Sequence, residues 1–294
     1  AFRGVWSEAD GLPGLVVDRY AAVAVVRCLT LGMTRCRPWV VEALRSIEGV
    51  TYYYGHDEEV AGKLEGFEPL QGWISEAGPA EVEIREGPCR FVVAIEGGQK
   101  TGFYLDQREN RALVAGLARG RTFLDVFCYT GAFACQGLVA GATRAVAIES
   151  SPEALALARR NLELNGAADR AELREGNAFD LLRAMERSGE RYDLIVLDPP
   201  PFTRTKTALE AAARGYKEIN LRALRLLNPG GILATFSCSH HVSPADFEEI
   251  VGGAAADAGV TVRVRAALTQ SRDHPILLSV PETRYLKGLL LEVV

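Results

Sequence analysis

From about residue 120 onward, short apolar runs alternate with amphipathic stretches, and this constrains the fold of the 294-residue chain more than any other feature. We predict strands at "TFLDVF", "RAVAIE", "AELRE", "DLIVLD" and "GILATFS", and helices at "GAFACQGLVAG", "SPEALALARRNLELNG", "NAFDLLRAMERSG" and "YKEINLRALRLLNPGG". Strands that alternate with helices build βαβ units around a parallel sheet. The predicted fold class is therefore α/β, with a Rossmann-like sheet.

One of these helices carries clear start and stop residues. Ser151 is a favourable N-cap, Pro152 suits the first helical position, and Gly166 follows the end. We therefore expect a helix between Pro152 and Gly166.

The first 95 residues or so have a different pattern. "GLVVDRY", "AVAVVRCL", "VTYYYG" and "CRFVVAIEGG" are β-rich runs around one expected helix, "RPWVVEALRSI". The stretch "GGQKTGFYLDQRENRALVAGLA" then joins the two parts, first as a loop and then as a helix that starts near Asp106. A chain of this length accommodates two domains. We predict a small β-rich α+β domain over residues 1–98, on the RNA or substrate side, and a larger domain over 99–294.

Composition and charge exclude several classes of protein. No apolar run approaches the roughly 18 residues of a membrane span, and no signal peptide opens the chain, so we expect a cytoplasmic protein without a membrane partner. A net charge of −5 disfavours an extensive nucleic-acid coat but leaves room for a local basic patch. Because the first residue is Ala1, we expect that an upstream segment was removed or left out.

Cysteine spacing argues against structural metal sites and disulfides. The six cysteines are scattered, at 28, 36, 89, 128, 135 and 238, without C-x-x-C spacing or a partnered H-x-x-x-H. We therefore predict no metal site.

Acidic and polar residues follow three of the predicted strands, where an open α/β sheet binds its ligand. Asp125 ends the first strand, Glu149 stands about 20 residues later, where an acid grips a ribose, and Asn177 with Ala178 could frame an adenine. The loop after Asp125 has one glycine, Gly131, and no G-x-G-x-x-G, which disfavours a pyrophosphate cofactor such as NAD. Together these residues favour an adenosine-bearing cofactor such as S-adenosylmethionine.

Each of these residues also has a plain structural explanation. Asp125 could be structural, Glu149 could cap a helix or be a solvated charge, and Asn177 could be an N-cap. Their joint occurrence in the right order is what favours the cofactor.

The fourth predicted strand ends in "LDPPPF". Prolines fix φ and lack an N–H, so Pro199 and the two that follow should form a rigid, non-helical lip. Such a lip could present the Asp198 carboxylate to the edge of a planar base. The alternative is a plain loop with a capping aspartate.

These motifs, in this order, resemble a known family along essentially the whole chain. "GLPGLVVDRY", "GQKTGFYLDQREN", "FLDVFCYTGAFA", "LDPPPF", "FSCSHH" and "PETRYLKG" are similar to the 23S ribosomal RNA (cytosine-C5)-methyltransferases of the large-subunit methyltransferase I type. The resemblance implies a class I S-adenosylmethionine-dependent methyltransferase domain behind a small central domain. Members usually carry an N-terminal PUA domain, which we expect this chain to lack.

The resemblance also implies positions for the site residues. The target base would face Asp198 and Cys238. The residues implied around the cofactor are Lys100, Phe103, Asp106, Gln107, Asp125, Tyr129, Gly131, Glu149, Ser150, Asn177, Ala178, Asp198 and Pro199.

Cys238 is the predicted nucleophile. Carbon 5 of cytosine is a poor nucleophile, but a thiolate that adds to carbon 6 makes carbon 5 enamine-like, so that it can attack the sulfonium methyl. Asp198 would hydrogen-bond nitrogen 3 and the amino group of the base. The alternative is inert packing, which is common for cysteine and which we expect for the other five. His240 and His241 are best interpreted as surface histidines.

The cytosine would have to be unpaired or flipped from its stack. Arg204, Lys206, Arg214 and Lys217, in "TRTKTALEAAARGYK", could hold RNA phosphates or simply form a solvated segment. Edge strands in the β-rich part could support a homodimer.

Three other functions remain as alternatives. The nearest is methylation of an exocyclic amine of guanine in RNA, for which Cys238 would be dispensable. The others are an RNA-binding assembly protein with a vestigial cofactor pocket and, more distantly, an NAD-dependent oxidoreductase.

Overall fold

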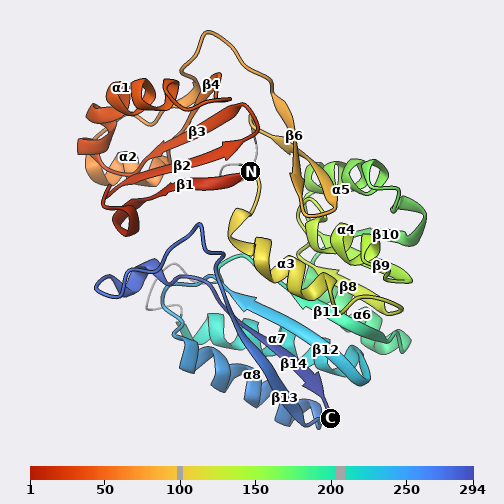
Figure 1. The fold of residues 1–294 in the computed structure, drawn as a ribbon. Coiled ribbons are helices and arrows are strands. Elements are labelled where there is room, and N and C mark those ends of the chain that lie inside the picture. The colour runs from red at the N-terminus through yellow and green to blue at the C-terminus, as the bar shows by residue number, and fades with distance from the viewer. Residues whose placement is uncertain (98–101, 203–208) are drawn as a thin grey trace. The chain divides into compact units, whose positions relative to one another are not determined.

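The structure is a computed structural model that describes residues 1–97, 102–202 and 209–294. The chain forms two compact units, which we call unit 1 and unit 2 (Figure 1). Unit 1 contains Ala1–Arg108 and Ser271–Thr283, and unit 2 contains Glu109–Gln270 and Arg284–Val294. The C-terminal segment Ser271–Thr283 thus returns to unit 1. The predicted boundary after residue 98 had assigned this segment to the larger domain.

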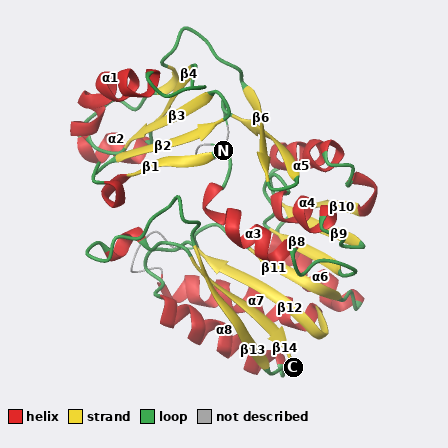
Figure 2. Cartoon of the chain, viewed as in Figure 1, coloured by secondary structure: helices red, strands yellow, loops and turns green. Residues whose placement is uncertain are grey.

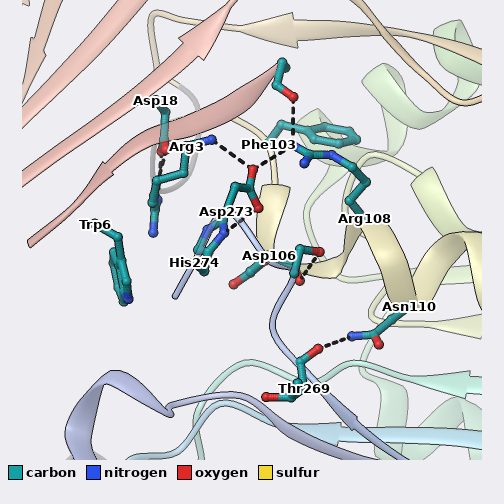
Figure 3. Close-up of polar contacts among 12 residues, drawn as sticks. Arg3, Trp6, Asp18, Phe103, Asp106, Arg108, Asn110, Thr269, Asp273 and His274 are labelled. Carbon is teal, nitrogen blue, oxygen red and sulfur yellow. Dashed lines mark hydrogen bonds and ion pairs between the residues drawn. The ribbon is translucent and has the colours of Figure 1, made fainter. Parts of the chain in front are cut away.

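Asp273 ties the returning segment into unit 1. Its carboxylate accepts a hydrogen bond from the backbone N–H of Arg3 (3.0 Å), and it forms ion pairs with Arg108 (2.9 Å) and His274 (3.0 Å), as Figure 3 shows. Burial opposes ionisation of Asp273, but the contacts with His274, Arg3 and Arg108 outweigh burial and bring its pKa down to about 2. The segment is therefore held by charge as well as by packing.

Unit 1 is built on a mixed sheet with strand order β1-β2-β3-β4-β5. Only β3 and β4 are parallel, because the helix α1 connects them, and the other pairs are antiparallel. A separate hairpin pairs β6 with β7. The elements are β1 (Phe2–Trp6), β2 (Leu15–Tyr20), β3 (Val23–Cys28), α1 (Leu31–Arg45), β4 (Tyr52–His56), α2 (Glu59–Glu65), β5 (Gln71–Trp73), β6 (Glu81–Glu86) and β7 (Cys89–Ala94).

The core of unit 1 lies between α1 and this sheet. Val41 and Leu44 of α1 pack with Val17, Val26 and other buried aliphatic residues of β2 and β3. α1 begins earlier than the predicted helix, at Leu31, because the Thr30 side chain caps it there.

Unit 2 contains a sheet of strand order β10-β9-β8-β11-β12-β14-β13. β10 through β12 run parallel, and β14 is antiparallel to both of its neighbours. The chain winds outward from β8 in both directions, so the strand order reverses between β8 and β11. The strands are β8 (Thr122–Val126), β9 (Arg144–Glu149), β10 (Ala171–Glu175), β11 (Tyr192–Leu197), β12 (Leu227–Ser237), β13 (Val262–Thr269) and β14 (Lys287–Val293).

Helices cover both faces of this sheet (Figure 2). α6, α7 and α8 bury Leu182, Tyr216 and Phe247 against one face, and α4 and α5 pack on the other. The central strands β8, β9 and β11 are buried almost throughout, as expected for parallel strands covered on both sides. The helices are α3 (Arg108–Ala115), α4 (Ala132–Val139), α5 (Pro152–Leu164), α6 (Ala178–Ser188), α7 (Leu209–Leu226) and α8 (Pro244–Ala258).

The predicted α/β fold class is confirmed, and the five predicted strands of unit 2 are present. One predicted helix was wrong at both ends: α7 begins at Leu209, and residues 227–231 belong to β12. Pro229 lacks an N–H and Gly230 has a φ of 73°, so this segment does not continue a helix.

Several elements were not predicted: β1, α2, β5, β6, α8, β13 and β14. Among the described residues, no helix is long and apolar enough to cross a membrane.

The N-cap of α5 gives a direct test of the local fold. The Ser151 hydroxyl accepts a hydrogen bond from the N–H of Ala154 (3.1 Å), so Ser151→Ala should lower the free energy of unfolding by about 1 kcal/mol. Ser279→Ala is the control, because this serine is exposed in a turn and caps no helix, and it should change stability by less than ~0.5 kcal/mol. Urea denaturation followed by far-UV circular dichroism measures both. Equal effects of the two substitutions would contradict the capping role.

Candidate active site

The carboxyl ends of β8, β9, β10, β11 and β12 meet at one edge of the unit 2 sheet, next to the point where the strand order reverses. Open α/β sheets bind ligands at this position. The predicted residues Asp125, Glu149, Asn177, Asp198 and Cys238 all lie at or just beyond these strand ends.

The loop from β8 to α4 has an unusual backbone. Phe127 (φ 65°) and Tyr129 (φ 48°) both occupy the left-handed region, which costs a non-glycine residue about 1–3 kcal/mol. Gly131 (φ 76°) follows, and a Cβ there would lie 3.1 Å from the Cβ of Ala158 on α5. Strain of this kind persists only where surrounding contacts hold the backbone in place.

Glu149 supplies part of that hold. One carboxylate oxygen accepts a hydrogen bond from the N–H of Tyr129 (3.0 Å), and the other accepts from the N–H groups of Ser150 (2.7 Å) and Ser151 (3.1 Å) and from the Ser150 hydroxyl (3.1 Å). Glu149 therefore joins the end of β9 to the β8 loop and to the start of α5. A capping or solvated role for Glu149, the alternative drawn from the sequence, does not include this hydrogen bond from Tyr129.

Asp125 is almost completely buried, with 1% of its surface exposed. One carboxylate oxygen accepts a hydrogen bond from the N–H of Ala134 in the first turn of α4 (3.0 Å), and the other has no hydrogen-bond partner in the described structure. Burial, reinforced by the nearby charges of Asp198 and Glu149, raises the pKa of Asp125 to about 7. A buried carboxylate with a free oxygen is suited to receive a donor from a ligand.

Asn177 is the N-cap of α6, the role that was the alternative to an adenine contact. Its side-chain oxygen accepts a hydrogen bond from the N–H of Phe179 (2.9 Å) at the start of α6. The N–H of the preceding Gly176 donates to the carbonyl of Glu149 (3.0 Å). The end of β10 is thereby joined to the end of β9, and an adenine contact by Asn177 and Ala178 stays a prediction.

Phe202 anchors the proline lip after Asp198. Its ring lies 4.6 Å from that of Tyr216, 5.7 Å from Phe179 and 6.4 Å from Phe127, measured between ring centroids. The lip therefore packs on α7, on α6 and on the strained β8 loop, while Pro200 and Pro201 remain exposed. This packing supports the prediction of an ordered lip rather than a plain loop.

Cys238 lies beside this lip, immediately after β12. Its half-buried Sγ is 3.8 Å from the carbonyl oxygen of Pro199. The next residue, Ser239, is buried; its hydroxyl is 2.8 Å from the hydroxyl of Tyr216, and its carbonyl accepts a hydrogen bond from the Lys287 ammonium (2.6 Å). The strand end that presents the thiol is thus held from α7 and from β14.

The other cysteines are free, and all but Cys36 are buried. Burial raises the pKa of Cys128, in the β8 loop, well above its usual value, which makes this thiol unreactive at neutral pH. Of Cys128 and Cys238, the two cysteines just after β8 and β12, only Cys238 is partly exposed.

The predicted residues of "GQKTGFYLDQR" belong to unit 1. Phe103, Asp106 and Gln107 are buried there; Phe103 packs on Phe91 (ring centroids 5.3 Å apart), and its carbonyl accepts from the Tyr20 hydroxyl (3.2 Å). The Asp106 carbonyl accepts from Ser271 in the segment drawn in Figure 3. Lys100 lies outside the described residues. A role for these four residues in cofactor binding stays a prediction.

The predicted phosphate contacts are only partly described. Arg214 lies near Glu210 on exposed turns of α7 (3.9 Å), Lys217 forms an ion pair with Asp257 of α8 (2.8 Å), and Arg204 and Lys206 lie outside the described residues. His240 is exposed and its ring centroid is 6.3 Å from that of Tyr285. In the described part of the chain, no three His, Cys, Asp or Glu side chains gather as metal ligands.

Three residues of the site escaped the sequence reasoning. Arg111 of α3 is buried, lies 5.9 Å from the centroid of the Phe133 ring and stabilises the charge of Asp125. Tyr216 and Lys287 support the end of β12. Lys287 stands in "PETRYLKG", directly before the apolar run "GLLL", and a lysine at that position was the available indication.

The strand order, the antiparallel β14 and the acids at the strand ends define the class I methyltransferase fold. The family model for S-adenosylmethionine-dependent methyltransferases matches residues 65–266. Two solved structures share the fold: SMU.776, in complex with SAH (TM-score 0.87, 20% identity, 99% of this chain and 75% of that one), and Trm5b from Pyrococcus abyssi (TM-score 0.69, 16% identity, 94% and 74%).

Curated relatives narrow the assignment. Two proteins named ribosomal RNA large subunit methyltransferase I, from Alteromonas mediterranea and from Enterobacter sp. strain 638, are 42% and 39% identical to this chain. Each match covers the whole chain and 74% of the relative. The chain therefore belongs to the S-adenosylmethionine-dependent methyltransferase family and, within it, groups with the relatives of that name. S-adenosylmethionine is its cofactor, as predicted.

The raised pKa of Asp125 makes a testable statement about stability. Because the unfolded carboxyl titrates near 3.9, the folded protein binds more protons between about pH 4 and pH 7, and Asp125 lowers stability as the pH rises through this range. The stability of Asp125→Asn relative to wild type should therefore be higher at pH 8 than at pH 5. Thermal unfolding at the two pH values measures the gain.

Asp193 provides the control, because hydrogen bonds from Thr122 and Asn228 outweigh burial and hold its pKa below the usual range. Asp193→Asn should destabilise equally at pH 5 and pH 8. A pH-independent difference between Asp125→Asn and wild type would contradict the raised pKa.

Proposed function

We propose that this enzyme transfers the methyl group of S-adenosylmethionine to carbon 5 of a cytosine in 23S ribosomal RNA, with Cys238 as the nucleophile. The observation that carries the proposal is the half-buried Cys238 thiol beside the lip, at the sheet edge where Asp125 and Glu149 also lie. The names of the relatives support ribosomal RNA as the substrate.

The residues at the ends of β8 and β9 fit the cofactor. The free oxygen of Asp125 is buried at the reversal point, and Glu149 stands at the end of the next strand, where an acid binds a ribose. We assign Tyr129 and Gly131 to the methionine part with Asp125, Ser150 to the ribose side with Glu149, and Asn177 and Ala178 to the adenine. The bound cofactor supplies an electrophilic methyl group on its sulfonium.

Cys238 then activates the base. Its thiolate adds to carbon 6 of the cytosine, and the electron pair of the 5,6 double bond moves so that carbon 5 attacks the methyl group. A base removes the proton from carbon 5, the double bond forms again, and the thiolate leaves carbon 6. Covalent catalysis of this kind replaces one difficult substitution by several easier steps.

Asp198 and Pro199, at the start of the lip, would hold the cytosine during these steps. Asp198 would hydrogen-bond the edge of the base, which must be unpaired or flipped from its stack to enter. Arg214 and Lys217 on α7 would contact RNA phosphates in exchange for their present acidic partners. A homodimer through β1 or β5, the edges of the unit 1 sheet, stays a prediction.

Replacement of the nucleophile tests the mechanism. Cys238→Ala should reduce methyl transfer to 23S ribosomal RNA by at least about a thousandfold, because the covalent step is lost. Wild-type protein should form a covalent adduct at Cys238 with RNA that contains 5-fluorocytosine, since fluorine on carbon 5 blocks the release step. Cys36→Ala, at a half-buried thiol of α1, is the matched control and should retain full activity.

Full activity of Cys238→Ala, or the absence of an adduct, would refute the cytosine-C5 mechanism. If methyl transfer persists without Cys238, methylation of an exocyclic amine of guanine becomes the better interpretation. Analysis of the methylated nucleoside identifies the product in either case.

A second substitution tests the cofactor half of the site. Glu149→Ala should weaken S-adenosylmethionine binding about 10- to 100-fold, the effect of one or two charged hydrogen bonds. Isothermal titration calorimetry measures the affinity. Glu175→Ala is the control, because this exposed acid ends β10 directly beside Glu149. An unchanged affinity in Glu149→Ala would argue against the ribose role.

A further inference from the structure

Lys287 is a buried cation at the substrate end of the sheet. It opens β14, opposite Ser237 on β12 and Thr269 on β13, and only 7% of its surface is exposed. Its ammonium donates to the carbonyl of Ser239 (2.6 Å), and in the described residues it forms no ion pair with a carboxylate. Burial lowers the pKa of Lys287 to about 8, so most of the side chain is still charged at pH 7.

A buried ammonium needs an anion nearby, because burying a single charge is costly. A thiolate at Cys238 would act against burial and raise the pKa of Lys287 again. Cys238 follows the last residue of β12, and Lys287 opens the paired strand β14. The Lys287 ammonium is fixed on the carbonyl of Ser239, the residue next to Cys238.

The other titratable groups around Cys238 supply no better partner for the lysine. Tyr216 approaches from α7, but burial raises its pKa, so it is neutral at pH 7, and its hydroxyl is engaged with Ser239. Asp198 stands just after β11 and forms no ion pair with Lys287 in the described residues. The rings of His240 and Tyr285 contact each other. The thiolate of Cys238 is therefore the natural counter-ion of Lys287.

We propose that Lys287 is a positioning residue whose ammonium holds the sulfur of Cys238 as a thiolate, ready to add to the base. The inference rests on the proposed function, since it names the group that activates the nucleophile. The thiol proton passes to solvent, Lys287 remains protonated throughout, and no bond to the lysine forms or breaks. When the thiolate leaves carbon 6 of the product, it returns to the same ammonium.

Alkylation of Cys238 by iodoacetamide between pH 5.5 and pH 10, resolved by peptide mass spectrometry, tests the pairing without RNA. In the wild-type protein, the alkylation rate should have its midpoint at least one pH unit below the ~8.5 of an ordinary thiol. Lys287→Met should raise this midpoint by one unit or more and slow alkylation at pH 7 about tenfold. Lys63→Met, at an exposed lysine of α2, is the control and should leave the profile unchanged.

A wild-type midpoint at or above 8.5, or an unchanged profile in a folded Lys287→Met variant, would overturn the proposal. S-adenosylmethionine binding and thermal unfolding show whether the variant is folded, and if it is not, the wild-type profile decides alone. Because the alkylation assay does not depend on methyl transfer, it can fail while Cys238→Ala and the fluorocytosine adduct support the proposed function, and the reverse also holds.

Discussion

The hydrogen bonds to the Glu149 carboxylate are the interactions on which the cofactor side of unit 2 depends. They join the end of β9 to the β8 loop through Tyr129 and to the N-terminus of α5 through Ser150 and Ser151. Two non-glycine residues with positive φ lie in this loop, and their strain must be offset by surrounding contacts. The Glu149 carboxylate helps to offset this strain, because hydrogen bonds from N–H groups to a charged oxygen are strong.

Packing supports the substrate side in a different way. Phe202 fixes the proline lip by contact with rings from the β8 loop, α6 and α7, so the lip depends on the same loop that Glu149 holds. Tyr216 continues this contact to the end of β12 through Ser239. The residues proposed to bind the cofactor and the proposed nucleophile are thus connected through the β8 loop.

Much of the larger unit could be predicted because its strands are locally distinct. Buried parallel strands are continuous apolar runs, and caps such as Ser151 and Asn177 mark the helices between them. Most of the missed strands lack such patterns, whereas α8 does carry a start signal, Ser243 before Pro244. α8 contains Gly252 and Gly253 in its interior, β6 alternates charged and apolar residues in a hairpin outside the main sheets, and β13 exposes most of its side chains. The interior glycines weaken the helical pattern of α8, and the pairing partners of β6 and β13, rather than their own residues, define these two strands.

By itself, the sequence determined the α/β class, the order of the strands along the chain and the residues that end them, because the hydrophobic period and the capping residues are local properties. Tertiary structure alone decided which strands are neighbours, how the carboxylate of Glu149 is used, and that Lys287 lies against the end of β12. Those features depend on contacts between residues far apart in the chain: the distance from Cys238 to Lys287 along the sequence gives no indication that β14 inserts between β12 and β13. The charge beside the proposed nucleophile therefore becomes visible only in the folded sheet.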